Sequence, residues 1–460
     1  MNAESETLRQ CLAAFIHATG FESFSEEDVR YAKLCLLDFI GVAIVGGRQK
    51  VTSVISKVVA CASENGAATV WASNQQLNTA SAAMMNAVQG HAIDMDDGHR
   101  FANGHPGVVT IPAAVALAET QNLSGRELIE AIVIGYDMFI RLGTAINPDL
   151  LFHGFHTTAT IGTFCSAAVA SKLLGLSVSQ TENALSLAGL QSAGLLEALS
   201  SGEMGKSFQV GRAVQSGILA ALLARNGADG PECIFEGNKG FFKAFAQKTC
   251  DVESIRENIG KEFKISTVYF KRYAACRHIH PALDAILDIM ARDSFSINEI
   301  KSIEIDTYTI ANELTGHLAI EGSELAAKFS MPVAIGLMLV FGRADAPAFN
   351  CRNISDSRVQ SIANKVVISV NPDRDAKYPG QRQTCVTIHT ENKTYQREVA
   401  YPKGEPENPL SDEELIDKYE KNALQVYSES QVAKIRAAVL NIEKIDVAEL
   451  VGFLKAPAAQ

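Results

Sequence analysis

Several features that mark large classes of proteins are scarce or missing in this chain. Its 460 residues include 41 Lys and Arg against 52 Asp and Glu, giving a formal net charge of -11. The excess of basic residues with which nucleic-acid-binding proteins offset phosphate charge is therefore absent. The nine cysteines are scattered, odd in number and without a Cys-x-x-Cys pair. They indicate neither a disulfide framework nor a thiolate metal cluster, and they suit a reducing compartment.

Long apolar runs are missing as well. No uninterrupted run reaches the roughly 18 to 20 residues that a membrane span needs, and the stretch "LCLLDFIGVAIVGG" is interrupted by Asp38. The start of the chain, "MNAESETLRQ", lacks the basic and apolar regions of a secretory signal. We therefore expect a soluble cytoplasmic protein with no membrane and no nucleic-acid partner.

The length of the chain favours two domains, because one core rarely serves so many residues. Roughly the first 250 residues are patterned as successive helices, with apolar residues at helical spacing. Four helix starts carry Ser followed three residues later by an acid, the arrangement of a capping box. These signals stand at Ser25, Ser124, Ser179 and Ser411. After Ser124, the spacing predicts one buried stripe that contains Leu128, Ile132, Gly135, Phe139 and Leu142.

The pattern changes after about residue 270, where alternating and β-branched segments predict strands. These segments are 302–310, 364–371, 383–390 and 393–402, and "TENK" between the last two predicts a hairpin turn. Beyond the Pro- and Gly-rich "PKGEPENPL", helical patterning resumes. We expect a mainly α protein with a helical domain over 1–268, a smaller α+β domain over 269–402, and C-terminal helices over 403–460 that return to the helical domain.

Residues 91–107, "HAIDMDDGHRFANGHPG", crowd three carboxylates, three imidazoles, one guanidinium and three glycines into one segment. His91, Asp94, Asp96, Asp97, His99 and His105 could supply metal ligands. Their spacing matches neither His-Glu-x-x-His nor the alternating Asp loop of a calcium site. We therefore predict no metal and keep a metal site as the minor alternative.

Two further segments share this composition. "FHGFHTTATIGTF" brings His153 and His156 to a Thr-rich helix start, and "FKRYAACRHIHPALDA" contains Lys271, Arg277 and His278 where the domains change over. Imidazoles with carboxylates suit proton transfer near neutral pH, and clustered Lys and Arg suit carboxylate recognition. A polyanionic acid bound between these segments could exchange a proton next to a carboxylate.

The stretch "SSGEMGKS" at 200–207 imitates a phosphate-binding loop. Its first position is Ser rather than Gly, and no hydrophobic strand precedes it. We do not expect a nucleotide site here. The useful feature is Lys206, which stands beside two glycines at a junction of loop and helix.

Taken in order, these segments resemble the MmgE/PrpD family, whose members include dehydratases, decarboxylases and an epimerase of small carboxylic acids. The matching stretches include "HAIDMDDGH", "FHTTATIGTF", "KSFQVGRAVQSG", "KRYAACRHIHPALDA" and "PKGEPENPLSDEELIDKY". The resemblance implies a helical domain made from both ends of the chain, an α+β lid, a homodimer and no cofactor. It also implies that Asp94, His105, His156, Lys206 and Lys271 occupy active-site positions, with Arg277 as a carboxylate binder and Tyr308 as a further, loosely aligned position. We also expect His278, next to Arg277, to bind the substrate.

One segment departs from the family pattern. Where members often read Asp-Asp-Thr, this chain reads Asp96-Asp97-Gly98-His99, followed by Arg100. We expect His99 and Arg100 to lie beside the substrate and to set its identity. The function expected is a cofactor-independent lyase, a dehydratase or decarboxylase, acting on a small di- or tricarboxylate. An epimerase of an iminodiacid and a non-catalytic carboxylate binder remain alternatives, and the acid and base roles of Asp94, His105 and His156 are interchangeable at this point.

Overall fold

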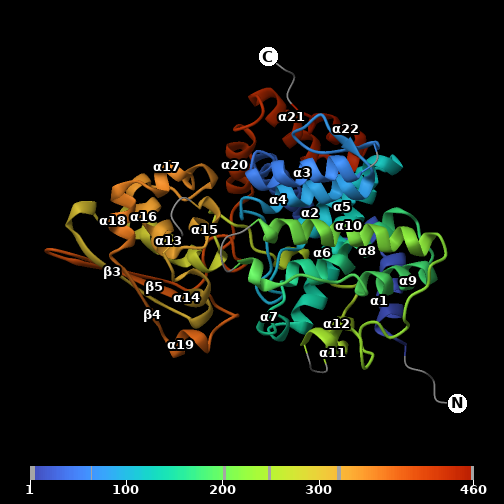
Figure 1. Ribbon diagram of the computed structural model, residues 1–460, viewed down its shortest axis with the longest axis horizontal. Helices are drawn as coiled ribbons and strands as arrows, with labels where there is room; N and C mark the ends of the chain where they lie inside the picture. Colours follow the sequence, from blue (N-terminus) through green and yellow to red (C-terminus); the bar gives the residue numbers. More distant parts are fainter. Residues whose placement is uncertain (1–5, 64, 200–203, 247–249, 319–322, 457–460) are drawn as a thin grey trace.

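The computed structural model describes residues 6–63, 65–199, 204–246, 250–318 and 323–456. Two bodies lie side by side: a larger one made of helices and a smaller one in which helices pack on a sheet (Figure 1). Helices from the start and from the end of the chain both belong to the larger body (Figure 1). The expectation of a mainly α protein with a smaller α+β part is confirmed.

Helices of the larger body begin where the sequence places capping residues. Ser25, Ser124 and Ser411 each accept a hydrogen bond from a backbone N–H of the first turn, and the acid three residues on reaches back. The apolar stripe predicted after Ser124 is buried. The helices that precede the smaller body in sequence are α1 (Leu8–Ala18), α2 (Glu26–Gly46), α3 (Lys50–Ala62), α4 (Thr79–His91), α5 (Pro106–Gln121), α6 (Gly125–Ile146), α7 (Asp149–Phe152), α8 (Thr157–Leu173), α9 (Val178–Gly189), α10 (Gly205–Arg225), α11 (Phe241–Ala246) and α12 (Val252–Arg256).

Two local expectations were wrong. Ser179 does not cap a helix, because Ser177 and Gln180 form a capping box two residues earlier and Ser179 lies inside α9. The first half is also not purely helical, since β1 (Ala68–Thr69) and β2 (Gln76–Leu77) form a short antiparallel pair. This pair is too short to give an alternating pattern that the sequence could reveal.

The smaller body, called the lid from here on, is built on a four-stranded sheet of order β4-β3-β5-β6. Its strands are β3 (Ile300–Thr307), β4 (Val366–Val370), β5 (Thr384–Thr390) and β6 (Thr394–Val399). Only β3 and β4 are parallel, and β5 and β6 form the predicted hairpin. The lid helices are α13 (His280–Arg292), α14 (Thr309–Thr315), α15 (Glu324–Lys328), α16 (Met331–Phe341), α17 (Cys351–Ile354), α18 (Ser357–Ala363) and α19 (Pro372–Asp375).

Two hydrophobic cores correspond to the two bodies. One joins buried residues between Leu8 and Phe270 with residues between Leu410 and Leu454. The other lies in the lid but includes Ile93 and Met95, which come from the loop after α4. Because both neighbours of residue 94 are buried in the lid core, this loop is fixed at the boundary between the two bodies.

The C-terminal helices support the same loop from behind. They are α20 (Asp412–Ala423), α21 (Glu429–Leu440) and α22 (Val447–Phe453). Lys418 of α20 forms a 2.6 Å ion pair with Asp38 of α2 and donates a hydrogen bond of 3.0 Å to the carbonyl oxygen of Met95. Asp38, which interrupts an apolar run in the sequence, thus has a buried partner. Among the described residues, no helix is long and apolar enough to cross a membrane.

Candidate active site

A cavity of about 80 Å³ lies where the larger body meets the lid. The loop after α4, the first turns of α8 and α10, and the segment around residue 271 all contribute to its wall. Of the described lining residues, four are Lys or Arg and one is an acid, so the cavity favours an anionic ligand. The ionisable lining groups with imidazole, cationic or carboxylate side chains are Asp94, His105, His156, Lys206, Lys271, Arg277, His278 and Arg382.

Asp94 joins two lysines that come from distant parts of the chain. Lys206, in the first turn of α10, forms a short ion pair with Oδ1 of Asp94. Lys271 Nζ lies 3.0 Å from Oδ2 of Asp94 and 3.0 Å from its carbonyl oxygen. Although burial opposes the charge of Asp94, the two ammonium groups hold the pKa of its carboxyl well below the ordinary value. Asp94 is therefore ionised and positions two cations, which is a different task from accepting a proton.

The backbone of Asp94 is also unusual. Its φ is +55°, the left-handed region that non-glycine residues rarely adopt. Ile93 and Met95 on either side are buried in the lid core, and the carboxylate of Asp94 contacts both lysines. Backbone strain of this kind persists where the surrounding structure over-determines it, and such places are often functional sites.

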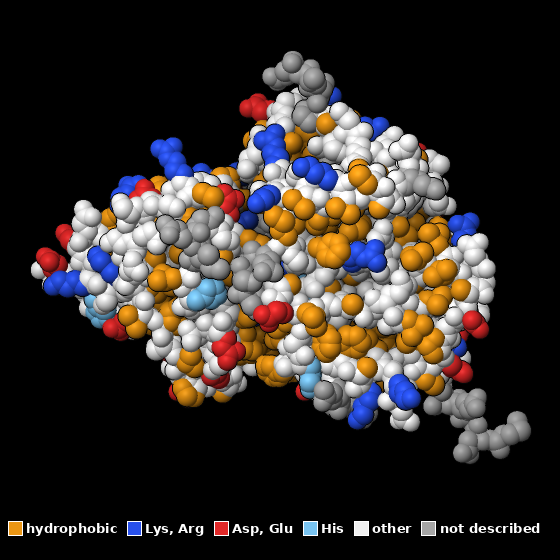
Figure 2. Space-filling model, viewed as in Figure 1, with side chains coloured by type: hydrophobic (Ala, Val, Ile, Leu, Met, Phe, Trp, Pro, Cys, Tyr) orange, Lys and Arg blue, Asp and Glu red, His pale blue; other side chains and the backbone are white. Residues whose placement is uncertain are grey.

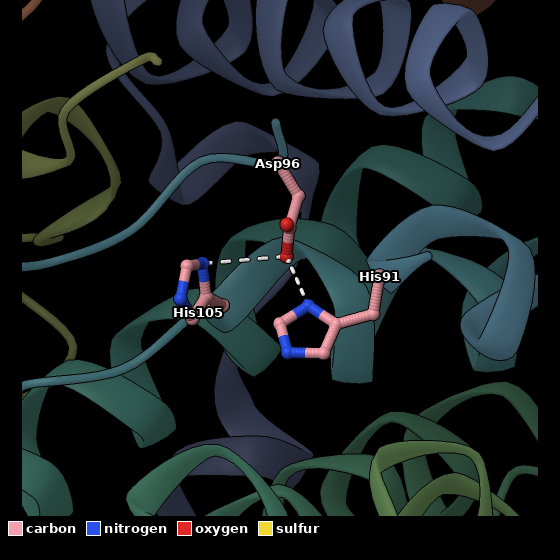
Figure 3. A group of neighbouring side chains, drawn as sticks. All are labelled: His91, Asp96 and His105. Atoms are coloured by element: carbon pink, nitrogen blue, oxygen red, sulfur yellow. Dashed lines mark hydrogen bonds and ion pairs between the residues drawn. The ribbon is translucent and has the colours of Figure 1, made fainter. Parts of the chain in front are cut away.

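Two imidazoles share one carboxylate beside the cavity (Figure 3). His91 Nδ1 lies 2.8 Å and His105 Nδ1 3.3 Å from Oδ2 of Asp96. Burial alone would raise the pKa of Asp96, but the two imidazoles lower it below the ordinary value. The ring centroids of His91 and His105 are 4.9 Å apart, nearly edge to face. Asp96 is therefore an anionic acceptor that fixes the orientation of both rings.

The hydrogen bonds of His105 define its tautomer. Its Nδ1 lies 2.6 Å from the carbonyl oxygen of Asp97, besides the contact with Asp96. Both partners are acceptors, so Nδ1 carries the hydrogen and Nε2 has the free lone pair. Burial lowers the pKa of His105 to about 3, and its position just before α5 adds the positive end of a helix dipole. His105 is a neutral imidazole whose Nε2 can accept a proton.

His156 has the opposite tautomer. Its Nδ1 lies 2.8 Å from Nε2 of Gln209, while Oε1 of Gln209 accepts a 3.1 Å hydrogen bond from the backbone N–H of Leu195. The same amide nitrogen also lies 3.3 Å from the carbonyl oxygen of Leu195. The backbone of Leu195 thus fixes the amide, which must donate to His156 Nδ1 and leave the hydrogen on Nε2. Burial lowers the pKa of His156 well below its ordinary value, so this ring is also neutral.

Asp97 differs from its neighbours in charge. It is buried, and one carboxyl oxygen accepts a 3.2 Å hydrogen bond from the backbone N–H of Gly107. Burial, together with the nearby charges of Asp96 and Asp38, raises the pKa of Asp97 to about 8. Asp97 is therefore protonated at neutral pH and acts in the hydrogen-bonding framework of the loop.

His91, Asp96 and His105 are grouped closely enough to be considered as ligands of one metal ion. One potential ligand atom from each residue lies within 4.8 Å of the others. A zinc ion would stand about 2 Å from each ligand atom, whereas the Nδ1 atoms here make contacts of hydrogen-bond length with acceptors, and His105 Nδ1 faces a carbonyl oxygen. These residues fit a proton relay better than a metal centre, and the absence of a metal stays a prediction.

Two arginines that line the cavity lie over the ring of Tyr269. The guanidinium carbons of Arg277 and Arg382 lie 4.5 Å and 5.2 Å from the Tyr269 ring centroid. Both arginines contact Oε1 of Glu405, at 3.1 Å and 3.0 Å. Burial opposes ionisation of Glu405, but the neighbouring arginines lower its pKa. A Cβ atom at Gly98 would lie 2.3 Å from the Tyr269 hydroxyl, so glycine is required there for the ring to pack.

Of the residues predicted from the sequence, seven line the cavity together: Asp94, His105, His156, Lys206, Lys271, Arg277 and His278. Three do not line it. Arg100 pairs with Glu407 and lies 3.6 Å from Glu405, and Tyr308 lies behind His278, with its hydroxyl 2.6 Å from Nδ1. His99 is buried, and its Nδ1 accepts a hydrogen bond from Ala102.

The expected position of His99 and Arg100 beside the substrate therefore does not agree with the structure. His99 and Gly104 pair through their backbones, which folds the loop back on itself. Gln209, Arg382, Glu405 and Tyr269 were missed by the sequence reasoning. Of the other residues considered, His153 is exposed, and His280 is buried and bonded to Arg277. Residues 200–203 of the segment compared with a phosphate-binding loop lie outside the described residues.

A larger groove of about 610 Å³ lies between the lid and α20. Several of its charged residues are already paired with one another, as in Arg343 with Asp345 and Lys421 with Asp417. It lacks the imidazoles and the buried unpaired groups of the smaller cavity. The smaller cavity is therefore the better candidate for chemistry.

Comparison with known proteins agrees with this assignment of the fold. The model of the MmgE/PrpD N-terminal domain matches residues 10–252, and the model of the MmgE/PrpD C-terminal domain matches residues 273–444. The chain belongs to the MmgE/PrpD family. Lys271 lies just between the two matched regions, where the larger body passes into the lid.

The relatives of this MmgE/PrpD chain are named for lyase reactions. A cis-aconitate decarboxylase-like protein of Aspergillus oryzae is 29% identical over 453 residues, which covers 92% of each chain. The cis-aconitate decarboxylase of Homo sapiens is 27% identical and covers 98% of this chain and 95% of the relative. A 2-methylcitrate dehydratase of Cupriavidus necator is 25% identical over 61% of this chain and 60% of the relative. These relatives support a lyase.

Proposed function

We propose that this protein is a lyase that acts on a small di- or tricarboxylate, without a cofactor, by proton transfer next to a carboxylate. The observation that carries the proposal is the pair of neutral histidines with opposite tautomers at one cavity. His105 offers a lone pair on Nε2, and His156 offers a hydrogen on Nε2. The lysines on Asp94 supply positive charge at the same cavity.

In a dehydration, the two rings would have complementary tasks. His105 Nε2 would take the proton on the carbon next to a carboxylate, and the carbon–oxygen bond would break. His156 Nε2–H would protonate the departing hydroxyl group, which leaves as water. The negative charge that develops on the carboxylate would be stabilised by Lys206 and Lys271, which are already fixed by Asp94.

In a decarboxylation of an unsaturated acid, the carbon–carbon bond to one carboxylate breaks and carbon dioxide leaves. The electron pair moves through the double bond onto the retained carboxylate, where the lysines stabilise it. His156 Nε2–H is the proton donor for the carbon that gains hydrogen. The relatives that cover most of this chain are named as cis-aconitate decarboxylases, so this reaction with cis-aconitate is our first choice.

The low pKa of His105 describes the protein without a ligand. A bound polyanion places negative charge next to the imidazole and raises its pKa toward the value that a general base needs. Binding of the substrate therefore places the reacting carbon in the cavity and also raises the pKa of His105, the general base. A neutral ligand of the same size would not do this.

The proposal is tested by assaying the purified protein with cis-aconitate, citrate and 2-methylcitrate while following carbon dioxide and conjugated alkene. Release of carbon dioxide from cis-aconitate identifies a decarboxylase, and appearance of a conjugated acid from a hydroxy acid identifies a dehydratase. His156→Gln, which removes the proton donor of both reactions, should remove most turnover while the melting temperature stays near that of the unchanged protein. Absence of turnover with all three acids would contradict the proposal and favour a carboxylate-binding relative.

We also propose that the protein is a homodimer in the cytoplasm. Exposed apolar side chains on α10 support the dimer, because Leu219 and Leu223 are 46% and 41% exposed on one face of that helix. Figure 2 shows hydrophobic side chains gathered over the face of the larger body that α10 crosses. Exposed apolar patches of this kind often mark protein interfaces. The cytoplasmic location rests on the sequence alone.

A further inference from the structure

Arg382 enters the cavity from the lid. It lies two residues before β5, whereas Lys206 belongs to α10 of the larger body. Its side chain is 3% exposed and lines the same cavity as Asp94 and the histidines. A ligand that contacts both Arg382 and Lys206 would therefore join the two bodies.

The hydrogen bonds of Arg382 leave one edge of its guanidinium group open. Nη1 donates to Oε1 of Glu405 at 3.0 Å, and this is its only hydrogen bond with the described residues. Nε is buried and has no hydrogen-bond partner in the described part of the chain. Nε and Nη2 form the side of the fork that can bind both oxygens of one carboxylate. A buried guanidinium nitrogen without an acceptor is costly, so this edge is arranged for a ligand.

Arg277 was the arginine predicted from the sequence to bind a carboxylate, but its guanidinium group differs from that of Arg382 in its hydrogen bonds. Its Nε donates to Glu405, Nη1 contacts His280 Nδ1 at 2.9 Å and the Lys403 carbonyl oxygen, and Nη2 donates to the Pro402 carbonyl oxygen. All three nitrogens already have partners. Arg277 therefore holds Glu405 in place, and Glu405 holds Arg382.

The ion pairs around Glu405 leave the positive charge of Arg382 without a full counter-charge. Glu405 is shared by Arg277 and Arg382, while Arg100 has a closer partner in Glu407. One carboxylate thus faces two buried guanidinium groups. A substrate carboxylate against the open edge of Arg382 would balance this charge and satisfy Nε at once.

We propose that Arg382 binds a second carboxylate of the substrate, remote from the carboxylate held by Lys206 and Lys271, and thereby restricts the substrate to acids with at least two carboxylates. The inference deepens the proposed function and rests on it for the reacting end of the molecule. Tyr269 and Glu405 are its positioning residues, because the ring and the carboxylate fix the guanidinium from two sides.

The experiment measures binding of propane-1,2,3-tricarboxylate, which has neither a hydroxyl group nor a double bond to react. Calorimetry compares it with butanoate, whose single carboxylate cannot reach both the lysines and Arg382. The variants are Arg382→Gln, Arg382→Lys and the control Arg374→Gln. Arg374 is a buried lid arginine that pairs with Asp306 and Glu398 and does not line the cavity.

We expect the unchanged protein to prefer the tricarboxylate, and Arg382→Gln to weaken its binding about 10- to 100-fold, the effect of losing a charge-assisted hydrogen bond. Butanoate has no second carboxylate for Arg382 and should lose little, so the preference collapses, while Arg374→Gln keeps it. Arg382→Lys retains the charge without the fork and should fall in between, which keeps the test valid if Arg382→Gln does not fold. Equal losses for both acids, an unchanged affinity in Arg382→Gln or Arg382→Lys, or no binding by the unchanged protein would overturn the proposal.

The outcomes separate the two proposals. Tricarboxylate binding that depends on Arg382 without turnover of any acid would leave the subsite standing and reject the lyase. Turnover with an unchanged KM in Arg382→Gln would reject the subsite and leave the lyase standing.

Discussion

Lys271 Nζ lies 3.0 Å from the Asp94 carboxylate and 3.0 Å from the Asp94 carbonyl oxygen, so one ammonium group fixes both the side chain and the backbone of a residue with positive φ. Lys206 contacts the other carboxylate oxygen. Two lysines from regions separated by more than sixty positions in the sequence are thereby brought to one wall of the cavity. The pair depends on the charge of Asp94.

Asp94→Asn should lower the free energy of unfolding by roughly 3 kcal/mol, because loss of one partner leaves buried charges uncompensated. Adding Lys206→Met removes one of those charges and should restore part of the loss. Chemical denaturation of the single and double variants measures both effects. Strictly additive losses in Asp94→Asn, Lys206→Met and the double variant would contradict the coupling.

Gln209→Glu should change the tautomer of His156. A carboxylate can only accept, so His156 Nδ1 must then carry the hydrogen, and the adjacent negative charge raises the pKa of the ring. Turnover at neutral pH should fall about 100-fold, within the range for loss of a general acid. Nitrogen NMR of the histidine rings reports the tautomer, and the pH dependence of kcat reports the shift.

The matched control for that change is Gln191→Glu. Gln191 donates to the carbonyl oxygens of Leu187 and Ser216 and does not line the cavity. It should keep both the His156 ring signals and the pH profile. If the two variants behave alike, Gln209 does not set the tautomer.

Asp97→Asn should alter how stability depends on pH. Burial raises the pKa of Asp97 to about 8, above the value of about 3.9 in an unfolded chain. The folded state therefore keeps a proton that the unfolded state releases, and this contribution is complete below about pH 4 and is lost as pH rises to 8. Asp97→Asn has no carboxyl proton to lose, so its free energy of unfolding does not fall in this way as pH rises. Its unfolding free energy minus that of the unchanged protein should rise by up to about 1.4 kcal/mol per pH unit across that window.

Denaturation curves between pH 4 and pH 8 measure this difference. The Asn side chain can still accept the hydrogen bond from Gly107 through its carbonyl oxygen, so the framework is retained. A difference that is constant with pH would mean that Asp97 is ionised in the folded protein.

Leu219→Glu combined with Leu223→Glu should convert dimers into monomers. Two carboxylates on the exposed face of α10 would be desolvated in any interface that covers this face. Val367→Glu is the control, because Val367 is 59% exposed on β4 of the lid, away from α10. Analytical ultracentrifugation measures the mass of each variant. Dimers in the double variant would place the interface elsewhere, and a monomeric unchanged protein would reject the dimer.

Much of this architecture is predictable because its signals are local. The cap at Ser25 and the hairpin between β5 and β6 depend on residues close together in sequence. Asp94, His105 and Lys271 stand out because they are polar residues clustered in an otherwise apolar chain. The resemblance to a family then indicated that these separate clusters meet.

What the sequence could not indicate depends on contacts between distant segments. Arg382 lies in "YPGQR", which reads as a turn, and Glu405 lies in a stretch interpreted as a boundary between domains and as a match to the family, with no role for its carboxylate. Neither reveals that the two side chains meet at 3.0 Å. Closeness in sequence to His105 also led to the prediction that Arg100 lies beside the substrate. The loop instead folds back on itself, and the guanidinium group of Arg100 pairs with Glu407.

The most direct test of the account follows the reaction by proton NMR in deuterated water, with cis-aconitate, citrate, 2-methylcitrate and iminodisuccinate offered separately. We predict net conversion of a citrate-type acid or of cis-aconitate, with one solvent deuterium on carbon in a decarboxylation product, and loss of this activity in His156→Gln. Deuterium entering recovered iminodisuccinate without net conversion, or no reaction with any of the four acids, would contradict the lyase.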